Sequence, residues 1–237
     1  KAADGSVLHW EMITPKLEPG KKYPVFFQHY GGPHAQQVSK AWGGALPQYL
    51  VSRGYIWFQL DNRGSANRGV DFESQIWHAM GSVEVEDQVA GANYLKTLPY
   101  VDANKVVTYG WSYGGYAALQ SPALAPDLFK AIVAIAPVTD LETLRKEALG
   151  FTNYDLVSKF IGSGPHVREG SPAQNAEKIK APVLMFHGDR DLNVGIGESR
   201  LMASKLRGAG KPVELVEFKG LDHQLDDDRA RTQMLDK

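Results

Sequence analysis

The sequence predicts an α/β fold with a mostly parallel, twisted sheet that carries helices on both faces. Apolar runs of strand length alternate along the chain with longer helix-like segments, which is the order that a parallel sheet requires. These runs lack the alternation of apolar and polar residues that marks a strand with one face in water. No internal repeat, low-complexity tract or Ser/Gly-rich linker divides the chain, so we expect a single domain over residues 1–237.

The expected strands follow the apolar runs in order along the chain. Each run is short enough for a strand and lies between segments that read as helices or turns. The six ranges are Val25–His29, Tyr55–Leu60, Val106–Tyr109, Ala131–Ala136, Val183–His187 and Val213–Phe218.

Helices are expected in the intervals, where apolar residues recur at spacings of three to four. The six ranges are Ser39–Arg53, Val85–Leu98, Gly114–Leu124, Leu141–Leu149, Ala173–Ile179 and Gly197–Arg207. The chain ends inside a charged, helix-compatible stretch, Asp226–Lys237. It begins with Lys1 and no signal-like segment, so we expect it to be a fragment of a longer protein.

Composition excludes several classes of protein. The formal net charge of −1 provides no overall field for gathering nucleic acid or anionic lipid. The longest apolar run, Ala131–Val138, is far shorter than the roughly 20 residues needed to cross a bilayer, so we expect no membrane insertion. The absence of cysteine excludes disulfides and thiol nucleophiles. His29, His34 and His187 show no metal-ligand spacing, so we expect neither a metal nor a cofactor.

A Gly-x-Ser-x-Gly motif carries the candidate nucleophile. It reads Gly110-Trp111-Ser112-Tyr113-Gly114, directly after one expected strand and directly before one expected helix. In that context the small flanking residues permit a strained turn that exposes the serine oxygen above the sheet. The alternative, a tight glycine turn with an idle serine, becomes the weaker interpretation once a base and an acid are found.

A serine hydroxyl needs a general base and a third group that orients the base. Only His223 lies beyond the last acid-bearing strand loop, in the order Ser, acid, His that this class of fold uses. Asp189 and Asp191 both follow the strand Val183–His187, and spacing alone does not choose between them. Asp222 ranks third because it is adjacent to His223.

Attack by the serine creates an oxyanion that needs preorganised donors. One donor is expected to be the backbone N–H of Tyr113, directly after the nucleophile. The second is expected from the loop Gln28–Pro33, where paired glycines permit a close approach of the backbone.

Five motifs in order resemble the catalytic domain of the prolyl oligopeptidase family of serine peptidases, which has the α/β-hydrolase fold. The motifs are Tyr30-Gly31-Gly32-Pro33, Asp61-Asn62-Arg63-Gly64-Ser65, Glu84-Val85-Glu86-Asp87-Gln88, Gly110–Tyr116 and His187–Val194. Two of them, the Tyr-Gly-Gly-Pro and Glu-Val-Glu-Asp-Gln sequences, point to the dipeptidyl peptidase branch.

The resemblance implies roles for individual residues. It matches Ser112 to the nucleophile, Asp191 rather than Asp189 to the acid, and His223 to the base. It also implies that the Tyr30 hydroxyl is the second oxyanion donor. For the substrate it implies that Asn193 binds a carbonyl and that side chains line the P1 pocket, namely Tyr113, Val138 and Val194.

The chain departs from that branch after Ala136-Pro137-Val138. The branch has a Trp and two Tyr there, which close a box around proline, whereas this chain continues to Leu141, Leu144 and Ala148. We therefore expect an aliphatic pocket that accepts proline, alanine or another small apolar residue.

The resemblance also implies partners within and between chains. A β-propeller is expected upstream in the full-length protein, in a periplasmic or secreted rather than a cytoplasmic location. A chain without the propeller exposes an apolar face, which favours association into a homo-oligomer.

The leading interpretation is a serine peptidase acting on short peptides. A carboxylesterase with the same three residues and a hydrolase-like binding module are the alternatives.

Overall fold

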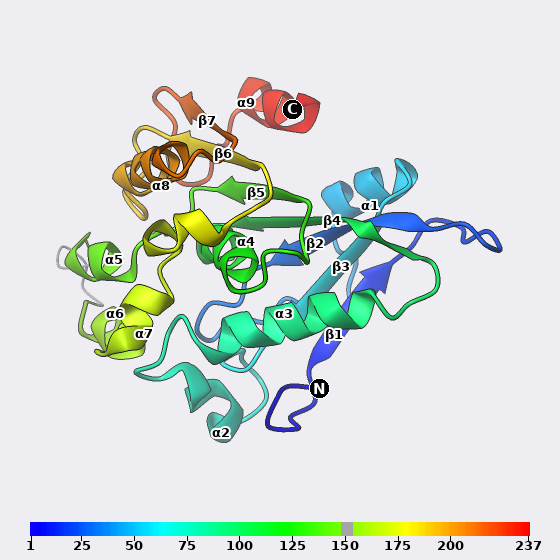
Figure 1. Cartoon of the computed structure of the whole chain (residues 1–237), viewed down its shortest axis with the longest axis horizontal. Helices are drawn as coiled ribbons and strands as arrows, with labels where there is room; N and C mark the ends of the chain where they lie inside the picture. Colours follow the sequence, from blue (N-terminus) through cyan, green and yellow to red (C-terminus); the bar gives the residue numbers. More distant parts are fainter. Residues whose placement is uncertain (148–153) are drawn as a thin grey trace.

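The computed structural model describes residues 1–147 and 154–237. Seven strands form one sheet in the order β1-β3-β2-β4-β5-β6-β7 (Figure 1). The strands are β1 His9–Ile13, β2 Tyr23–His29, β3 Ile56–Asp61, β4 Val101–Trp111, β5 Ala131–Ile135, β6 Val183–Gly188 and β7 Val213–Phe218. Only the β1–β3 pair is antiparallel, and the other five pairs are parallel. The predicted α/β fold with a mostly parallel sheet is confirmed.

The described residues also form nine α-helices and three short 3₁₀ turns. The helices are α1 Ala45–Ser52, α2 Val70–Glu73, α3 Val83–Leu95, α4 Tyr113–Leu124, α5 Leu141–Glu147, α6 Tyr154–Ile161, α7 Pro165–Glu169, α8 Gly197–Gly208 and α9 Asp228–Asp236. The 3₁₀ turns are η1 Ser74–Ile76, η3 Pro172–Gln174 and η4 Ala176–Lys178.

Successive strand residues point to opposite faces of the sheet, and this alternation assigns the helices to two layers. In β5, Ile132 and Ala134 pack in one apolar cluster with α4 and α8. Val133 instead packs with α9 on the opposite face. The sheet is therefore covered on both sides, and α4 is so enclosed that eleven of its twelve residues are buried.

Several element boundaries differ from those expected. The expected strand Val106–Tyr109 is the middle of the longer β4, and β1 was not expected at all. The helix expected from Ser39 begins only at Ala45, because Gly44 adopts a φ of +95° that a helix cannot continue through. The segment expected as the helix Ala173–Ile179 forms the two 3₁₀ turns η3 and η4 instead.

The remaining differences lie in the excursion between β5 and β6. The helix expected over Leu141–Leu149 is α5 as far as Glu147, and residues 148–149, which include Ala148, lie outside the described residues. The helices α6 and α7 were not expected, and they lie beside α5 at one end of the sheet (Figure 1).

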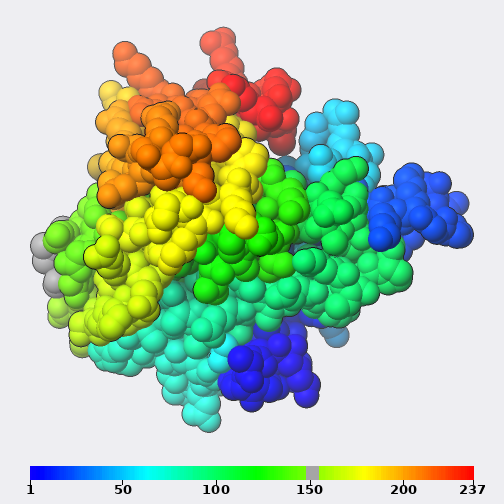
Figure 2. Space-filling view, viewed as in Figure 1, coloured from blue at the N-terminus to red at the C-terminus, as the bar shows by residue number. Residues whose placement is uncertain are grey.

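Two segments project from the body of the molecule. Residues 14–22, between β1 and β2, project from the body, and the amino-terminal residues form a separate protrusion (Figure 2). Over the described ranges, no helix combines the length and apolar content needed to span a bilayer.

Candidate active site

The predicted site residues follow the carboxyl ends of five parallel strands. Tyr30 follows β2, Ser112 follows β4, Val138 follows β5, Asp191 follows β6 and His223 follows β7. In a parallel sheet these ends share one edge, where open α/β folds bind their ligands. The topology thus brings together residues that are as much as 193 positions apart, since 223 − 30 = 193.

Ser112 occupies a strained turn between β4 and α4. Its φ of 59° and ψ of −121° are unfavourable for a residue with a Cβ. The turn is possible because its flanking glycines pack without side chains. A Cβ on Gly110 would lie 2.0 Å from the Gly114 oxygen, and one on Gly114 would lie 2.2 Å from the His29 oxygen. The Ser112 N–H donates to the Ile135 oxygen at 2.8 Å, which ties the turn to β5.

The ring of His223 meets the carboxylate of Asp191. The distance from His223 Nδ1 to Asp191 Oδ2 is 2.6 Å, and the Asp191 side chain is fully buried. The other carboxylate oxygen, Oδ1, accepts the backbone N–H groups of Asn193 and Val194 at 2.8 and 2.9 Å. Both oxygens are therefore held by donors, and the carboxylate has one fixed orientation.

Electrostatics keep that carboxylate ionised. Burial acts to raise the pKa of Asp191, but contacts with the two histidines His187 and His223 and with the Val194 N–H outweigh burial and hold the pKa well below its usual range. An ionised carboxylate only accepts hydrogen bonds, so Nδ1 of His223 is the nitrogen that donates to it, and in the neutral tautomer with this proton the lone pair is on Nε2.

The structure separates the three aspartates that the sequence left open. Asp191 contacts His223, whereas Asp189 Oδ1 accepts the Gly220 N–H at 2.5 Å and so holds the start of the loop after β7. Asp222 is exposed, and its Oδ1 accepts the Gln224 N–H. Asp191 is thus the aspartate placed to orient the His223 ring.

Ser112 and His223 lie at the same edge of the sheet, but their side chains are not joined by a hydrogen bond among the described residues. Within residues 1–147 and 154–237, no hydrogen bond joins the Ser112 hydroxyl to the His223 ring. The indole N–H of Trp111 donates to the His223 carbonyl oxygen at 2.9 Å, which places the His223 backbone beside the residue that precedes Ser112. Hydrogen bonds of this kind are often long in a free enzyme and shorten when substrate binds.

The two residues expected to supply the oxyanion donors, Tyr30 after β2 and Tyr113 at the start of α4, both have their rings close to Gly32. Tyr113 is the first residue of α4, so its N–H has no acceptor within the helix. A Cβ on Gly32 would lie 3.0 Å from the Tyr30 ring and 3.3 Å from the Tyr113 ring. Glycine at this position therefore permits the two tyrosine rings to pack against the loop after β2.

Three of the expected substrate-contacting residues form a single apolar wall. Tyr113, Val138 and Val194 are buried in one cluster, and the half-buried Tyr30 packs against it. Asn193 is exposed and lies one position before Val194. Directly after Val138 the described part of this cluster is aliphatic, with Leu141 buried and Leu144 partly buried, and farther along the chain it also contains the buried aromatic ring of Phe160.

Two buried glutamates that the sequence analysis did not identify accept hydrogen bonds from residues in or next to this apolar wall. Glu84 accepts the Tyr113 hydroxyl at 2.8 Å and the Ser82 N–H at 3.0 Å. Glu198 Oε2 accepts the Thr139 hydroxyl and N–H at 2.6 and 2.7 Å. Burial raises the pKa of both carboxyl groups, that of Glu198 to about 7. The Glu-Val-Glu-Asp-Gln motif was the only sequence signal for Glu84, and none pointed to Glu198.

The loop Asp61–Gly64 supports the site from below. The Arg63 guanidinium makes a forked contact with the Asp87 carboxylate, with Nη2 to Oδ1 at 2.8 Å and Nε to Oδ2 at 2.9 Å. Both side chains are buried, and Arg63 is only 4% exposed. A bidentate ion pair of this kind fixes the loop as scaffold.

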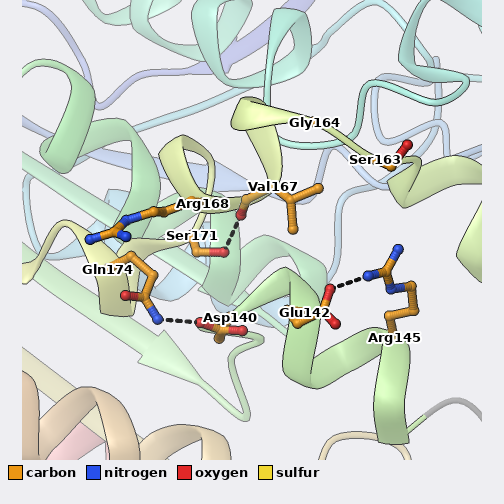
Figure 3. A pocket seen from close by; sticks show the side chains of 9 residues that line it. All are labelled: Asp140, Glu142, Arg145, Ser163, Gly164, Val167, Arg168, Ser171 and Gln174. Carbon is orange, nitrogen blue, oxygen red and sulfur yellow. Dashed lines mark hydrogen bonds and ion pairs between the residues drawn. The ribbon is translucent and has the colours of Figure 1, made fainter.

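A surface cavity of about 400 Å³ lies beside the excursion that contains α5 and α7 (Figure 3). Its lining residues are Asp140, Glu142, Arg145, Ser163, Gly164, Val167, Arg168, Ser171 and Gln174. Asp140 Oδ2 accepts the Gln174 amide at 2.7 Å and Ser171 Oγ donates to the Val167 oxygen at 2.6 Å. None of the predicted site residues lines this cavity.

His187 and His223 both contact one oxygen of Asp191, with His187 Nε2 at 3.2 Å and His223 Nδ1 at 2.6 Å from Oδ2. Over the described ranges, no group of three or more His, Cys, Asp or Glu side chains is placed to hold a metal ion.

Comparisons with known proteins agree with this geometry. The family model of the prolyl oligopeptidase family matches residues 44–237. Dipeptidyl peptidase 8 from Mus musculus is 34% identical over 227 residues, covering 91% of this chain and 25% of that protein. A protein named "Probable dipeptidyl peptidase 4" from Aspergillus fumigatus is 34% identical over 232 residues, covering 90% of this chain and 28% of that protein.

A solved structure extends the likeness to the fold. The crystal structure of Porphyromonas gingivalis dipeptidyl peptidase 4 matches with a TM-score of 0.89 at 28% identity, covering 100% of this chain and 33% of that one. The chain spans about a quarter of the length of the curated relatives it matches. With a family match over most of its length and with the strand order, serine turn and His–Asp pair described above, the chain belongs to the prolyl oligopeptidase family of serine peptidases.

Proposed function

We propose that this chain hydrolyses peptide bonds of short peptides through an acyl-enzyme on Ser112. The observation that carries the proposal is the 2.6 Å contact between His223 Nδ1 and Asp191 Oδ2 at the sheet edge where the strained Ser112 turn also lies. That contact favours the tautomer of the neutral His223 ring whose lone pair is on Nε2, which is the form that a general base requires.

In the acylation step, Ser112 Oγ attacks the carbonyl carbon of the scissile bond and its proton passes to His223 Nε2. The tetrahedral intermediate then collapses, the C–N bond breaks, and the proton on Nε2 passes to the leaving amine. In the second half, water attacks the acyl carbon while Nε2 takes a proton from it. The bond from Oγ to the acyl carbon breaks, and Ser112 recovers its proton.

The oxyanion of each intermediate is assigned to the Tyr113 N–H and the Tyr30 hydroxyl. The position of Tyr113 at the start of α4 supports this role, because the positive end of the helix dipole also faces the developing charge. Removing one such donor costs a factor of 10² to 10³ in rate in other serine hydrolases.

The proposed substrate is a dipeptidyl unit with a small apolar residue, proline or alanine, before the scissile bond. The dipeptidyl peptidase names of the relatives support the substrate class. The buried apolar wall, in which Val138 and Val194 are aliphatic, supports the small apolar preference. The exposed Asn193 is assigned to a carbonyl of the bound peptide.

The remaining length of the relatives supports a second domain. We assign residues 1–237 to one catalytic domain, and we propose a β-propeller elsewhere in the full-length protein and self-association as a homo-oligomer. Nearly three quarters of the mouse relative lies outside the matched region, which leaves room for a domain of that size.

Labelling with a fluorophosphonate probe tests the nucleophile. The unsubstituted protein is expected to be labelled, and Ser112→Ala is expected to abolish labelling, because the probe phosphonylates only an activated serine. Ser163→Ala, at an exposed position away from the turn, serves as the matched control and is expected to label normally. Labelling that persists in Ser112→Ala would remove Ser112 from its assigned role.

The substrate class needs a separate assay. Dipeptidyl p-nitroanilides and p-nitrophenyl esters are compared under one set of conditions. Cleavage of the amide substrates is expected, whereas cleavage of esters alone would identify a carboxylesterase instead.

A further inference from the structure

In the loop between β7 and α9, two side chains hold the segment that begins with His223, in addition to the contact of Asp189 with Gly220 at the start of the loop. Three successive carbonyl oxygens of this loop each accept a side-chain N–H. Trp111 Nε1 donates to the oxygen of His223 at 2.9 Å. Arg231 donates through Nη2 to the oxygen of Gln224 at 2.7 Å and through Nε to the oxygen of Leu225 at 2.9 Å.

The two donors are also joined to each other. The Arg231 guanidinium lies over the Trp111 ring, 4.6 Å from its centroid, which is a favourable cation–π geometry. Arg231 reaches this place because Asp227 caps α9 through the Ala230 N–H at 2.9 Å, which fixes where the helix begins. Trp111 belongs to the serine turn itself, directly before Ser112.

We propose that Trp111 and Arg231 are positioning residues that set the separation between Ser112 and His223. The pair is called the Trp111–Arg231 clamp below. This inference rests on the proposed function, since it concerns the same serine and histidine. It assigns the clamp a task that differs from that of Asp191, because Asp191 fixes the orientation of the ring at Nδ1 and, among the described residues, its carboxylate accepts backbone N–H groups only from Asn193 and Val194, outside this loop.

The loop needs such a constraint because its backbone is strained. Leu225 has a φ of 48°, which is unfavourable for a residue with a Cβ, and its side chain is fully buried. The direct bond between the Ser112 hydroxyl and the His223 ring is absent from the described residues, so it does not itself hold the loop in place. A displacement of about 1 Å at a base can cost about a hundredfold in rate.

The chemistry of the clamp is specific to its two residues. Tryptophan has a single N–H donor, and phenylalanine keeps the ring without that donor. Arginine offers a planar fork that meets two carbonyl oxygens at once, whereas the lysine ammonium is a single point of donation. Trp111→Phe therefore removes one of the three hydrogen bonds. Arg231→Gln removes the Nη2 hydrogen bond and the charge over the Trp111 ring, whereas Arg231→Lys keeps the charge but offers a single point of donation.

Hydrogen exchange tests the clamp without any assay of activity. In the full-length natural protein, Trp111→Phe and Arg231→Gln are expected to speed exchange in the segment 220–227 by about tenfold and to leave other segments unchanged. Arg53→Gln is the matched control, because the Arg53 guanidinium also lies over a ring, that of Tyr49 at 5.2 Å, at the opposite end of the sheet. Unchanged exchange in segment 220–227 would overturn the clamp whatever the catalytic activity.

The rate of fluorophosphonate labelling tests what the clamp does. Trp111→Phe and Arg231→Gln are expected to slow labelling about 10- to 100-fold and to lower kcat with KM within about twofold. Arg231→Lys is expected to lie between Arg231→Gln and the unsubstituted protein, and it replaces Arg231→Gln if that variant does not fold.

Repeating Trp111→Phe in a variant that lacks His223 distinguishes a positioning role of the clamp from a general structural role. In a His223→Ala protein, Trp111→Phe is expected to cause no further change in the residual labelling rate, because the clamp acts only through His223. The same loss in both backgrounds would overturn the positioning role. Absence of labelling in the unsubstituted protein would instead refute the proposed function, and the exchange experiment would still decide whether the clamp exists.

Discussion

At the scale of single residues, the site depends on positions that have no side chain. The Ser112 turn brings the backbone of residue 110 against that of residue 114 and the backbone of residue 114 against that of His29. Those contacts explain why a strained φ at Ser112 persists, since the surrounding backbone leaves it no other arrangement. The motif is thus a packing requirement as much as a chemical one.

Gly110→Ala should destabilise the protein far more than a comparable change elsewhere. Its Cβ would lie 2.0 Å from the Gly114 oxygen, so the turn must open, at a cost of about 3 kcal/mol or more in the free energy of unfolding. Gly197→Ala, in α8 with nothing within 4 Å of the new Cβ, should change that free energy by less than about 1 kcal/mol, in the stabilising direction. Urea denaturation measures both, and similar values for the two variants would contradict this account.

Residue identity and chain order predicted the serine and the histidine, but the residues alone did not choose the aspartate. Asp189 and Asp191 are two positions apart after the same strand, and the difference between them is spatial. One meets the Gly220 N–H and the other meets the His223 ring. That difference depends on the path of the loop after β7, which a single sequence does not specify.

At the scale of elements, the strands were predictable where both faces are buried and less so elsewhere. β3 is buried at all six positions and was found almost whole. β1 escaped because it lies at the edge, reads His-Trp-Glu-Met-Ile, and has no fully buried residue. The segment Pro172–Lys178 has apolar spacing suited to a helix, yet the intervening Asn175 is not helical and two 3₁₀ turns form.

Hydrogen bonds to Glu198, a residue outside every sequence motif, connect α8 to the loop after β5. Glu198, in the first turn of α8, accepts hydrogen bonds from Thr139 and Asp140, which are one and two positions after Val138 of the apolar wall. Burial raises the pKa of Glu198 to about 7, the hydrogen bonds from Thr139 oppose the rise, and Glu147 adds to it. An isolated glutamate in a sequence gives no sign of such an environment.

The stability of the protein should therefore depend on pH through Glu198. Its folded-state pKa lies above the ordinary value of 4.5, so the folded state binds more protons than the unfolded state between about pH 4.5 and 7. The corresponding stability is fully present below about pH 4.5 and is lost as the pH rises through 7. The loss amounts to a difference on the order of 3 kcal/mol.

Glu198→Gln removes this dependence because glutamine does not ionise. The free energy of unfolding of the variant minus that of the unsubstituted protein should rise between pH 5 and pH 8 by up to about 3 kcal/mol. Denaturant titrations at several pH values measure the difference. Glu177→Gln, at an exposed position, is the control and should give a flat difference. A flat difference for Glu198→Gln as well would refute the account of its burial.

At the scale of the whole molecule, one sheet contributes side chains to three of the four apolar clusters that the described residues form. β1, β2 and β3 pack in one apolar cluster, while β6 and β7 pack in others at the far side. The helix α4 joins two of these clusters, because Leu119 belongs to the one with β5 and β6 and Ala117 belongs to the one that contains the apolar wall. Strand β4 joins the other two, because Val106 packs with β1–β3 and Trp111 packs with α9. Loss of β4 would therefore expose apolar surface in both of the clusters that it joins.

This continuity predicts that residues 1–237 unfold as one cooperative unit, as the assignment to a single domain requires. Trp57 on β3 and Trp111 at the end of β4, beside the loop after β7, report on the two sides of the sheet. Variants that keep only one of these tryptophans should give the same urea midpoint as each other and as the far-ultraviolet circular dichroism. Midpoints that differ between the two probes would show that the β1–β3 and β6–β7 sides unfold separately, and the chain would then consist of two units that share a sheet.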